Sequence, residues 1–176
     1  DRYLKHQTYN SMGCDFADFN NDTHPDLLTV DMLPETDFAQ KTMAGAMTWD
    51  KWQLISHAGY ESQYMRNSLQ LAGVSATDKF SEIAQLSGVS ATDWSWSPLF
   101  ADFDNDGWKD LYITNGYLRD ITDKDFLDYS NNLSMFKSKA QADLDLMPKI
   151  RQLKGKKQPN YVFRNNGDLT FSQKSE

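Results

Sequence analysis

Carboxylates recur at alternating positions in the segment 102–110, which reads Asp-Phe-Asp-Asn-Asp-Gly-Trp-Lys-Asp. They are Asp102, Asp104, Asp106 and Asp110, at positions 1, 3, 5 and 9 of the segment. Like charges held this close repel one another unless a cation lies between them, and calcium accepts about six to eight oxygen ligands at flexible geometry. Gly107 at position 6 suits a loop that wraps an ion, because glycine adopts positive φ without a Cβ clash. With the backbone carbonyl of Trp108 as a further oxygen, the segment predicts a calcium-binding loop.

Two other structures compete with this interpretation of the loop. An EF-hand continues to a bidentate Glu at position 12 and then into a helix. Here position 12 is Ile113, within the apolar, β-branched and aromatic run 111–114, which is typical of a strand. The loop is therefore expected between two strands, with Asp110 as its last ligand. A solvated turn rich in Asp and Asn, without an ion, remains an alternative because such turns are common.

The same four places recur 84 positions earlier in the chain, in the segment 18–26. They carry Asp18, Asn20, Asp22 and Asp26, and the carbonyl of His24 stands at the place of the Trp108 carbonyl. Repetition of one supersecondary unit indicates an array architecture. In this earlier loop Asn20 removes one charge, and Thr23 replaces the glycine at position 6, where a β-branched residue is unfavourable because φ is positive. The first loop is expected to bind calcium more weakly, or to keep its shape without the ion.

The composition limits the classes of protein to consider. With 176 residues, 39% of them hydrophobic and 13% aromatic, the chain is expected to fold around a core. A net charge of −7 and a pI near 4.9 argue against a nucleic-acid partner, which requires clustered Lys and Arg. No run reaches the roughly 18 apolar residues of a membrane span. The single Cys14 excludes an internal disulfide and is expected to pack as a small buried hydrophobe.

The rest of the chain alternates strand-like and helical segments. Strands are expected at 9–18, 26–32, 63–71, 80–83, 95–101 and 111–114, followed by a hairpin over 160–172. The last four of these strands before the hairpin are expected to form one unit, with the loop 102–110 between the third and the fourth. Thr48 can cap a helix that Gly59 ends. A second helix is expected from Thr122 through Ala142, with a break at Met147–Pro148.

These segments resemble a known repeat. Ala101–Gly107 followed by Asp110–Gly116, together with Phe163–Asp168 ahead of Thr170-Phe171, resembles the FG-GAP or VCBS repeat of integrin α-subunit β-propellers and bacterial surface proteins. The approach Trp94-Ser95-Trp96-Ser97 is similar to the cartilage acidic protein group, whose bacterial members often carry an ASPIC/UnbV domain.

The resemblance implies a mainly β chain with helical insertions, built from antiparallel four-stranded blades of a larger β-propeller. It divides the chain into a partial blade with the first calcium loop (1–33), a helical insert (34–60), a complete blade with the second calcium loop (61–116), a second helical insert (117–158) and the start of a next blade (159–176). It assigns calcium to both loops. The ligands it implies are Asp102, Asp104, Asp106, the Trp108 carbonyl and Asp110 in the second loop, and Asp18, Asn20, Asp22, the His24 carbonyl and Asp26 in the first.

Two classes of function follow. The resemblance implies a non-catalytic calcium-binding module of a secreted, periplasmic or cell-surface protein, which binds a protein or glycan ligand and can self-associate through blade edges. The alternative is part of a glycan-active hydrolase or lyase that uses paired surface carboxylates about 5–10 Å apart. We favour the binding module, because the carboxylate clusters belong to the ion loops and His6, His24 and His57 have no Ser or Cys partner in a recognisable catalytic context.

Overall fold

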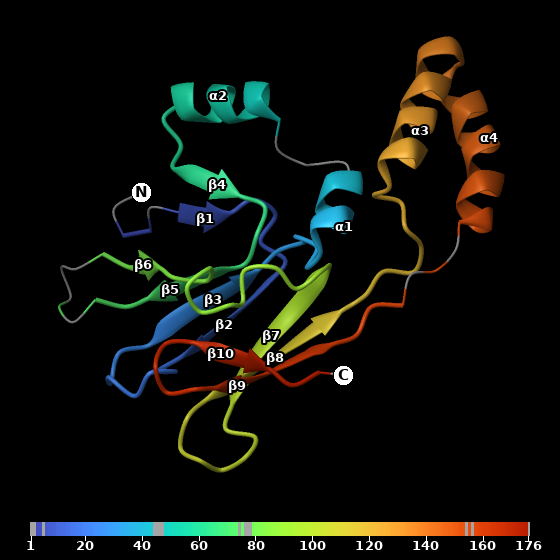
Figure 1. Ribbon diagram of the computed structural model, residues 1–176. Coiled ribbons are helices and arrows are strands. Elements are labelled where there is room, and N and C mark those ends of the chain that lie inside the picture. The colour runs from blue at the N-terminus through green and yellow to red at the C-terminus, as the bar shows by residue number, and fades with distance from the viewer. Residues whose placement is uncertain are drawn as a thin grey trace.

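The strands form two four-stranded antiparallel sheets, each a meander in chain order (Figure 1). The computed structural model describes residues 3–4, 6–43, 48–73, 75, 79–153, 155 and 157–175. The first sheet contains β2 (Gly13–Ala17), β3 (Asp26–Val30), β5 (Ser68–Leu71) and β6 (Ser81–Glu82). The second contains β7 (Ser95–Ala101), β8 (Asp110–Asn115), β9 (Tyr161–Asn165) and β10 (Phe171–Gln173). A separate parallel pair joins β1 (His6–Thr8) to β4 (Ser62–Tyr64).

The sheets group the strands differently from the predicted blade at 61–116. That range is divided, because β5 and β6 close the first sheet whereas β7 and β8 open the second. Each acidic loop therefore joins the first and second strands of a sheet, rather than the third and fourth. The segment 83–94 connects the first sheet to the second and is bonded to both. The Val89 carbonyl accepts a hydrogen bond from the side chain of Asn67, next to β5, and the Ser87 carbonyl accepts one from the backbone of Phe171 in β10. These contacts between distant residues are invisible to strand periodicity, which predicts where strands occur but not which strands pair.

Two helical insertions lie at the end of the sheets opposite the acidic loops (Figure 1). The first, between β3 and β5, contains α1 (Asp37–Thr42) and α2 (Trp49–His57). The second, between β8 and β9, contains α3 (Lys124–Phe136) and α4 (Lys139–Gln152). Thr48 caps α2, as predicted, because its side chain accepts a hydrogen bond from the Lys51 amide. Of the described helices, none is both long and apolar enough to cross a membrane.

The second insertion breaks earlier than predicted. Lys137 has an extended backbone and Ser138 caps the next helix by accepting from the Gln141 amide, so the chain turns there into an antiparallel helical hairpin. Pro148, predicted to end the helix, lies inside α4. A proline in a helix removes one backbone hydrogen bond, yet α4 packs against α3 and continues past Pro148 to Gln152. The cap of α3 is Asp123 rather than Thr122.

The core lies between the two sheets and joins unlike faces of them. In the first sheet, the row Asp15–Leu28–Leu69 points toward the second sheet, since the Asp15 carboxylate accepts a hydrogen bond from the Phe100 amide. In the second sheet, the contacting row is Phe100–Leu111–Phe163. Both β2–β3 and β7–β8 have the same register, with Ala17 opposite Asp26 and Ala101 opposite Asp110. A shift of 84 positions therefore relates Phe100 to Phe16. Phe100 faces the first sheet, whereas Phe16 lies on the face of the first sheet that points away from the second. The two sheets thus contact each other through non-equivalent faces, front to back.

This stacking explains why two apolar side chains of β2 are exposed. Phe16, equivalent to the buried Phe100, is 62% exposed because it lies on the face of the first sheet that points away from the second. Cys14 shares that face and is also exposed, so the prediction that it is buried is wrong. The error arises because a strand pattern does not say which of its two faces is covered.

Candidate metal centre

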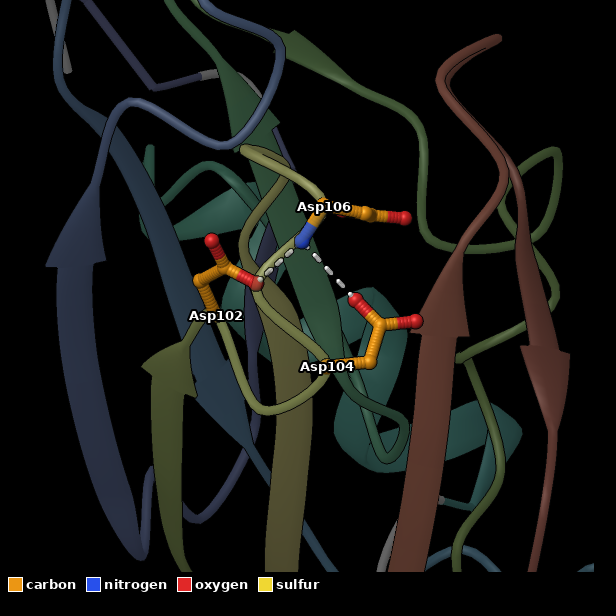
Figure 2. Close-up of side chains that lie close together, drawn as sticks. All are labelled: Asp102, Asp104 and Asp106. Atoms are coloured by element: carbon orange, nitrogen blue, oxygen red, sulfur yellow. Dashed lines mark hydrogen bonds between the residues drawn. The ribbon is translucent and has the colours of Figure 1, made fainter.

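The second acidic loop brings three carboxylates together (Figure 2). One oxygen from each of Asp102, Asp104 and Asp106 lies within 4.8 Å of the other two. The Asp106 amide donates to Asp102 Oδ1 at 3.1 Å and to Asp104 Oδ1 at 3.2 Å. The Gly107 amide donates to Asp102 Oδ2 at 3.0 Å, and the Trp108 amide donates to Asp106 Oδ1 at 2.9 Å. Gly107 has φ of +90°, as its position in the loop predicts.

The donor set fits a hard divalent cation. Calcium–oxygen distances of about 2.4 Å allow two ligand oxygens to lie up to about 4.8 Å apart, and all three carboxylates meet this limit. All three side chains are exposed, so an ion could reach them from solvent. When bound, such an ion supplies positive charge that crosslinks the turn. The residues of the loop orient the carboxylates through their backbone amides.

Asp110 occupies a different environment from the three clustered carboxylates. It lies at the start of β8, is 3% exposed and accepts the Phe103 amide on Oδ2 at 3.1 Å and the Asn165 amide on Oδ1 at 2.9 Å. These bonds anchor the loop to its own start and to β9. Each carboxylate oxygen has a second lone pair, so an anchoring role is compatible with a ligand role. The predicted ligand roles of Asp110 and of the Trp108 carbonyl stay predictions.

The first loop repeats this hydrogen-bond pattern. The Asp22 amide donates to Asp18 Oδ1 at 3.0 Å and to Asn20 Oδ1 at 3.3 Å, and the His24 amide donates to Asp22 Oδ1 at 2.8 Å. The Thr23 amide donates to Asp18 Oδ2 at 2.9 Å, as Gly107 does to Asp102. The Asn20 side-chain amide also donates to Asp22 Oδ2 at 2.8 Å, which lowers the pKa of Asp22. The first loop therefore has the predicted shape with one carboxylate fewer.

Asp26 anchors the first loop as Asp110 anchors the second. It is fully buried and accepts the Phe19 amide on Oδ2 at 3.3 Å and the Ala72 amide on Oδ1 at 2.8 Å. Burial raises the pKa of Asp26 to about 6, although both amides act in the opposite direction. The predicted ligand roles of Asp26 and of the His24 carbonyl stay predictions.

Arg164 and Asn165, to which the sequence analysis assigned no role, contact the loops through their side chains. Arg164 of β9 donates to Asp104 Oδ2 and Asp106 Oδ2, both at 2.9 Å. Asn165, which is 3% exposed, donates through its side chain to the carbonyls of Phe19 at 2.8 Å and Lys109 at 3.0 Å.

Asn21 extends this link between the loops. Its side-chain amide donates to the Gly107 carbonyl at 3.1 Å, so the two loops are bonded directly as well as through Asn165. Arg164 and Asn165 belong to the motif Phe-Arg-Asn-Asn-Gly-Asp at 163–168, which indicates the repeat but not these contacts. Nothing local in the sequence connects Asn21 to a loop 86 positions away.

Thr23→Gly is expected to stabilise the chain by about 0.5–1 kcal/mol. Thr23 has φ of +74°, where a β-branched residue is strained and glycine is not. The reciprocal variant Gly107→Thr is expected to destabilise by about 1–2 kcal/mol, through backbone conformation alone because no atom lies within 4 Å of an added Cβ. Urea unfolding in chelator measures the change in the free energy of unfolding for both variants. A Thr23→Gly variant that is no more stable than the parent contradicts the prediction.

The fold and the loops define a mainly β repeat protein with antiparallel four-stranded sheets. A family model described as FG-GAP-like repeat matches residues 63–113, from β4 through the second loop into β8. This match supports the predicted resemblance to FG-GAP repeat proteins, whereas the resemblance to the cartilage acidic protein and ASPIC/UnbV group receives no support from it. Comparison with curated proteins found no match, and neither did comparison with solved structures.

Proposed function

We propose that the chain is a non-catalytic pair of β-propeller blades from a secreted or cell-surface protein, in which the second loop binds a structural calcium ion. The observation that carries the proposal is the convergence of Asp102, Asp104 and Asp106 within 4.8 Å, in a segment that matches an FG-GAP-like repeat. We infer a structural role for this ion, because all of its proposed ligands come from one turn between two strands.

Front-to-back stacking supports the propeller. When the front of one sheet contacts the back of the next, one front face and one back face remain uncovered at the two ends of the pair. Repeating the same contact with further sheets either closes a ring or continues as an open array. The free row Leu99–Tyr112–Val162 of the second sheet is equivalent to Asp15–Leu28–Leu69, which is covered in the first. Leu99 is 50% exposed there. Further blades of the same kind would cover this row.

If the sheets act as a scaffold, we expect the ligand-binding surface on the two helical insertions. These lie at the opposite end of the sheets from the loops and expose large apolar side chains. In α2, Trp49 and Trp52 stack with ring centroids 5.0 Å apart, and Trp49 is 66% exposed. Aromatic faces of this kind contact proteins and sugars alike. The carboxylates of Glu35 and Asp93 meet at the hydroxyl of Tyr161 in β9. We assign Glu35 to holding the first insertion against the second sheet, and Asp93 to holding the connecting segment 83–94 there.

A calcium titration of thermal stability tests the proposal. A ligand that binds the folded state alone, at about 100 times its Kd, adds about 2.7 kcal/mol, which for a chain of this size corresponds to a rise in Tm of about 5–10 °C. The 176-residue chain is melted in excess chelator and then across a calcium series, with magnesium as the control. Magnesium requires stricter octahedral geometry, so a much smaller rise is expected with it. A Tm independent of calcium contradicts the proposed site.

A further inference from the structure

Arg164 places a positive charge against the proposed calcium loop. Its Nε donates to Asp104 Oδ2 and its Nη2 to Asp106 Oδ2, each at 2.9 Å, so one guanidinium bridges two of the three clustered carboxylates. In Figure 2 an oxygen of Asp104 is turned toward the neighbouring strand, and Arg164 lies on β9. Hydrogen bonds between a guanidinium and a carboxylate are charge-assisted and stronger than those between neutral groups. The hydrogen bond from the Trp108 amide lowers the pKa of Asp106, and the Arg164 contact acts in the same direction.

The first loop shows what the same turn does without an arginine. The residue equivalent to Arg164 is Leu71, because Gln70 and Phe163 pair with the equivalent residues Leu27 and Leu111. There the Oδ2 of Asp22 accepts from the neutral amide of Asn20 instead. The second loop thus carries one carboxylate more than the first and one guanidinium that the first lacks. Arg164 is therefore present at the loop that has the additional carboxylate, Asp104, and absent from the loop that has Asn20 in its place.

We propose that Arg164 is the internal cation of the second loop, which neutralises the carboxylates while the loop is free of ion and thereby opposes calcium binding. The inference rests on the proposed calcium site. Its physical basis is that the guanidinium and the ion compete for the same two side chains, and a positive charge beside a divalent cation raises its free energy. The loop then keeps one shape in both states, and its calcium affinity is lower than its four carboxylates alone would provide.

Arg164→Gln separates this role from a purely structural one. Without the guanidinium, calcium is expected to bind roughly three- to tenfold more tightly, since one nearby unit charge is removed in a largely solvated site. In chelator, Tm is expected to fall by about 1–4 °C, because the carboxylates repel one another unopposed. Saturating calcium is expected to restore most of this loss. Both effects should shrink as salt increases, because exposed charges are screened over about 8–10 Å.

Two control variants complete the experiment, which measures calcium affinity by calorimetry and Tm in chelator and in calcium. Lys174→Gln removes a positive charge from the same hairpin at its far end, where the Lys174 amide bonds to Val162, and should leave the affinity unchanged. Arg164→Lys keeps the charge without the planar guanidinium that bridges the two carboxylates, and should bind calcium as the parent does, within about twofold.

The outcomes distinguish this inference from the proposed function. Tighter binding by Arg164→Gln, with a stability loss confined to chelator, supports the inference. If the parent binds calcium and Arg164→Gln binds it equally or more weakly, Arg164 orients the ligands instead and the inference alone is overturned. An equal loss of Tm in chelator and in calcium likewise overturns it. If neither protein binds calcium, the proposed function fails and the inference fails with it.

Discussion

Phe100→Ala is expected to destabilise the chain by about 3–5 kcal/mol, the usual cost of removing a buried phenylalanine. Phe100 is 8% exposed and belongs to the buried cluster between the two sheets. Its ring stacks on that of Phe19 with centroids 6.1 Å apart, and Phe19 in turn contacts Phe171 of β10. Truncation leaves a cavity at the centre of the front-to-back contact. Urea unfolding monitored by tryptophan fluorescence measures the change.

Phe16→Ala is the matched control for Phe100→Ala. The two residues occupy equivalent places in their sheets, but Phe16 is 62% exposed, so a change of less than about 1 kcal/mol is expected. Equal losses for the two variants would show that the sheets do not stack through unlike faces. In a longer chain whose preceding blade covers Phe16, the same substitution should cost as much as Phe100→Ala does here. The pair therefore also tests the proposed continuation of the array.

Asp106→Ala is expected to weaken calcium binding by about tenfold or more and to abolish most of the calcium-dependent rise in Tm. The variant loses one of three convergent oxygens and the acceptor of the Trp108 amide, and even changes in residues that only orient ligands cost about 10–100-fold. Calorimetry gives the affinity, and melts in chelator and in calcium give the coupled stability. If the parent and the variant have the same Tm in chelator and the same Tm in calcium, the second loop is not the calcium site.

Asp22→Ala is the internal control for Asp106→Ala, because Asp22 holds the equivalent place in the first loop. Its effect on calcium binding is expected to be smaller, since that loop has Asn20 in place of a carboxylate and a strained Thr23. Comparable effects at the two sites would show that neither Asn20 nor the strain at Thr23 weakens the first loop. Asp125→Ala, in the first turn of α3, controls for loss of a charge far from both loops.

Much of each loop was predictable because its shape is decided locally. Carboxylates spaced by two residues can all accept amides of the same turn, and a turn of this kind needs positive φ at position 6. The sequence alone therefore determined that Asp102, Asp104 and Asp106 converge and that Thr23 takes an unfavourable positive φ, which is +74° in the structure. It also determined the helix cap at Thr48, which depends on residues a few positions away. Interactions within about one turn of chain leave their pattern in the sequence.

Only the tertiary structure decided which strands share a sheet, which faces are covered and what surrounds the loops. Phe16 and Phe100 stand in the same local pattern, yet the contact between the two sheets buries Phe100 and leaves Phe16 exposed. Arg164 reaches Asp104 and Asp106 from a strand that follows a helical insertion, and Asn165 joins loops that are 84 positions apart. These contacts depend on how two sheets pack, and packing involves residues too distant in the chain for any local spacing to reveal them.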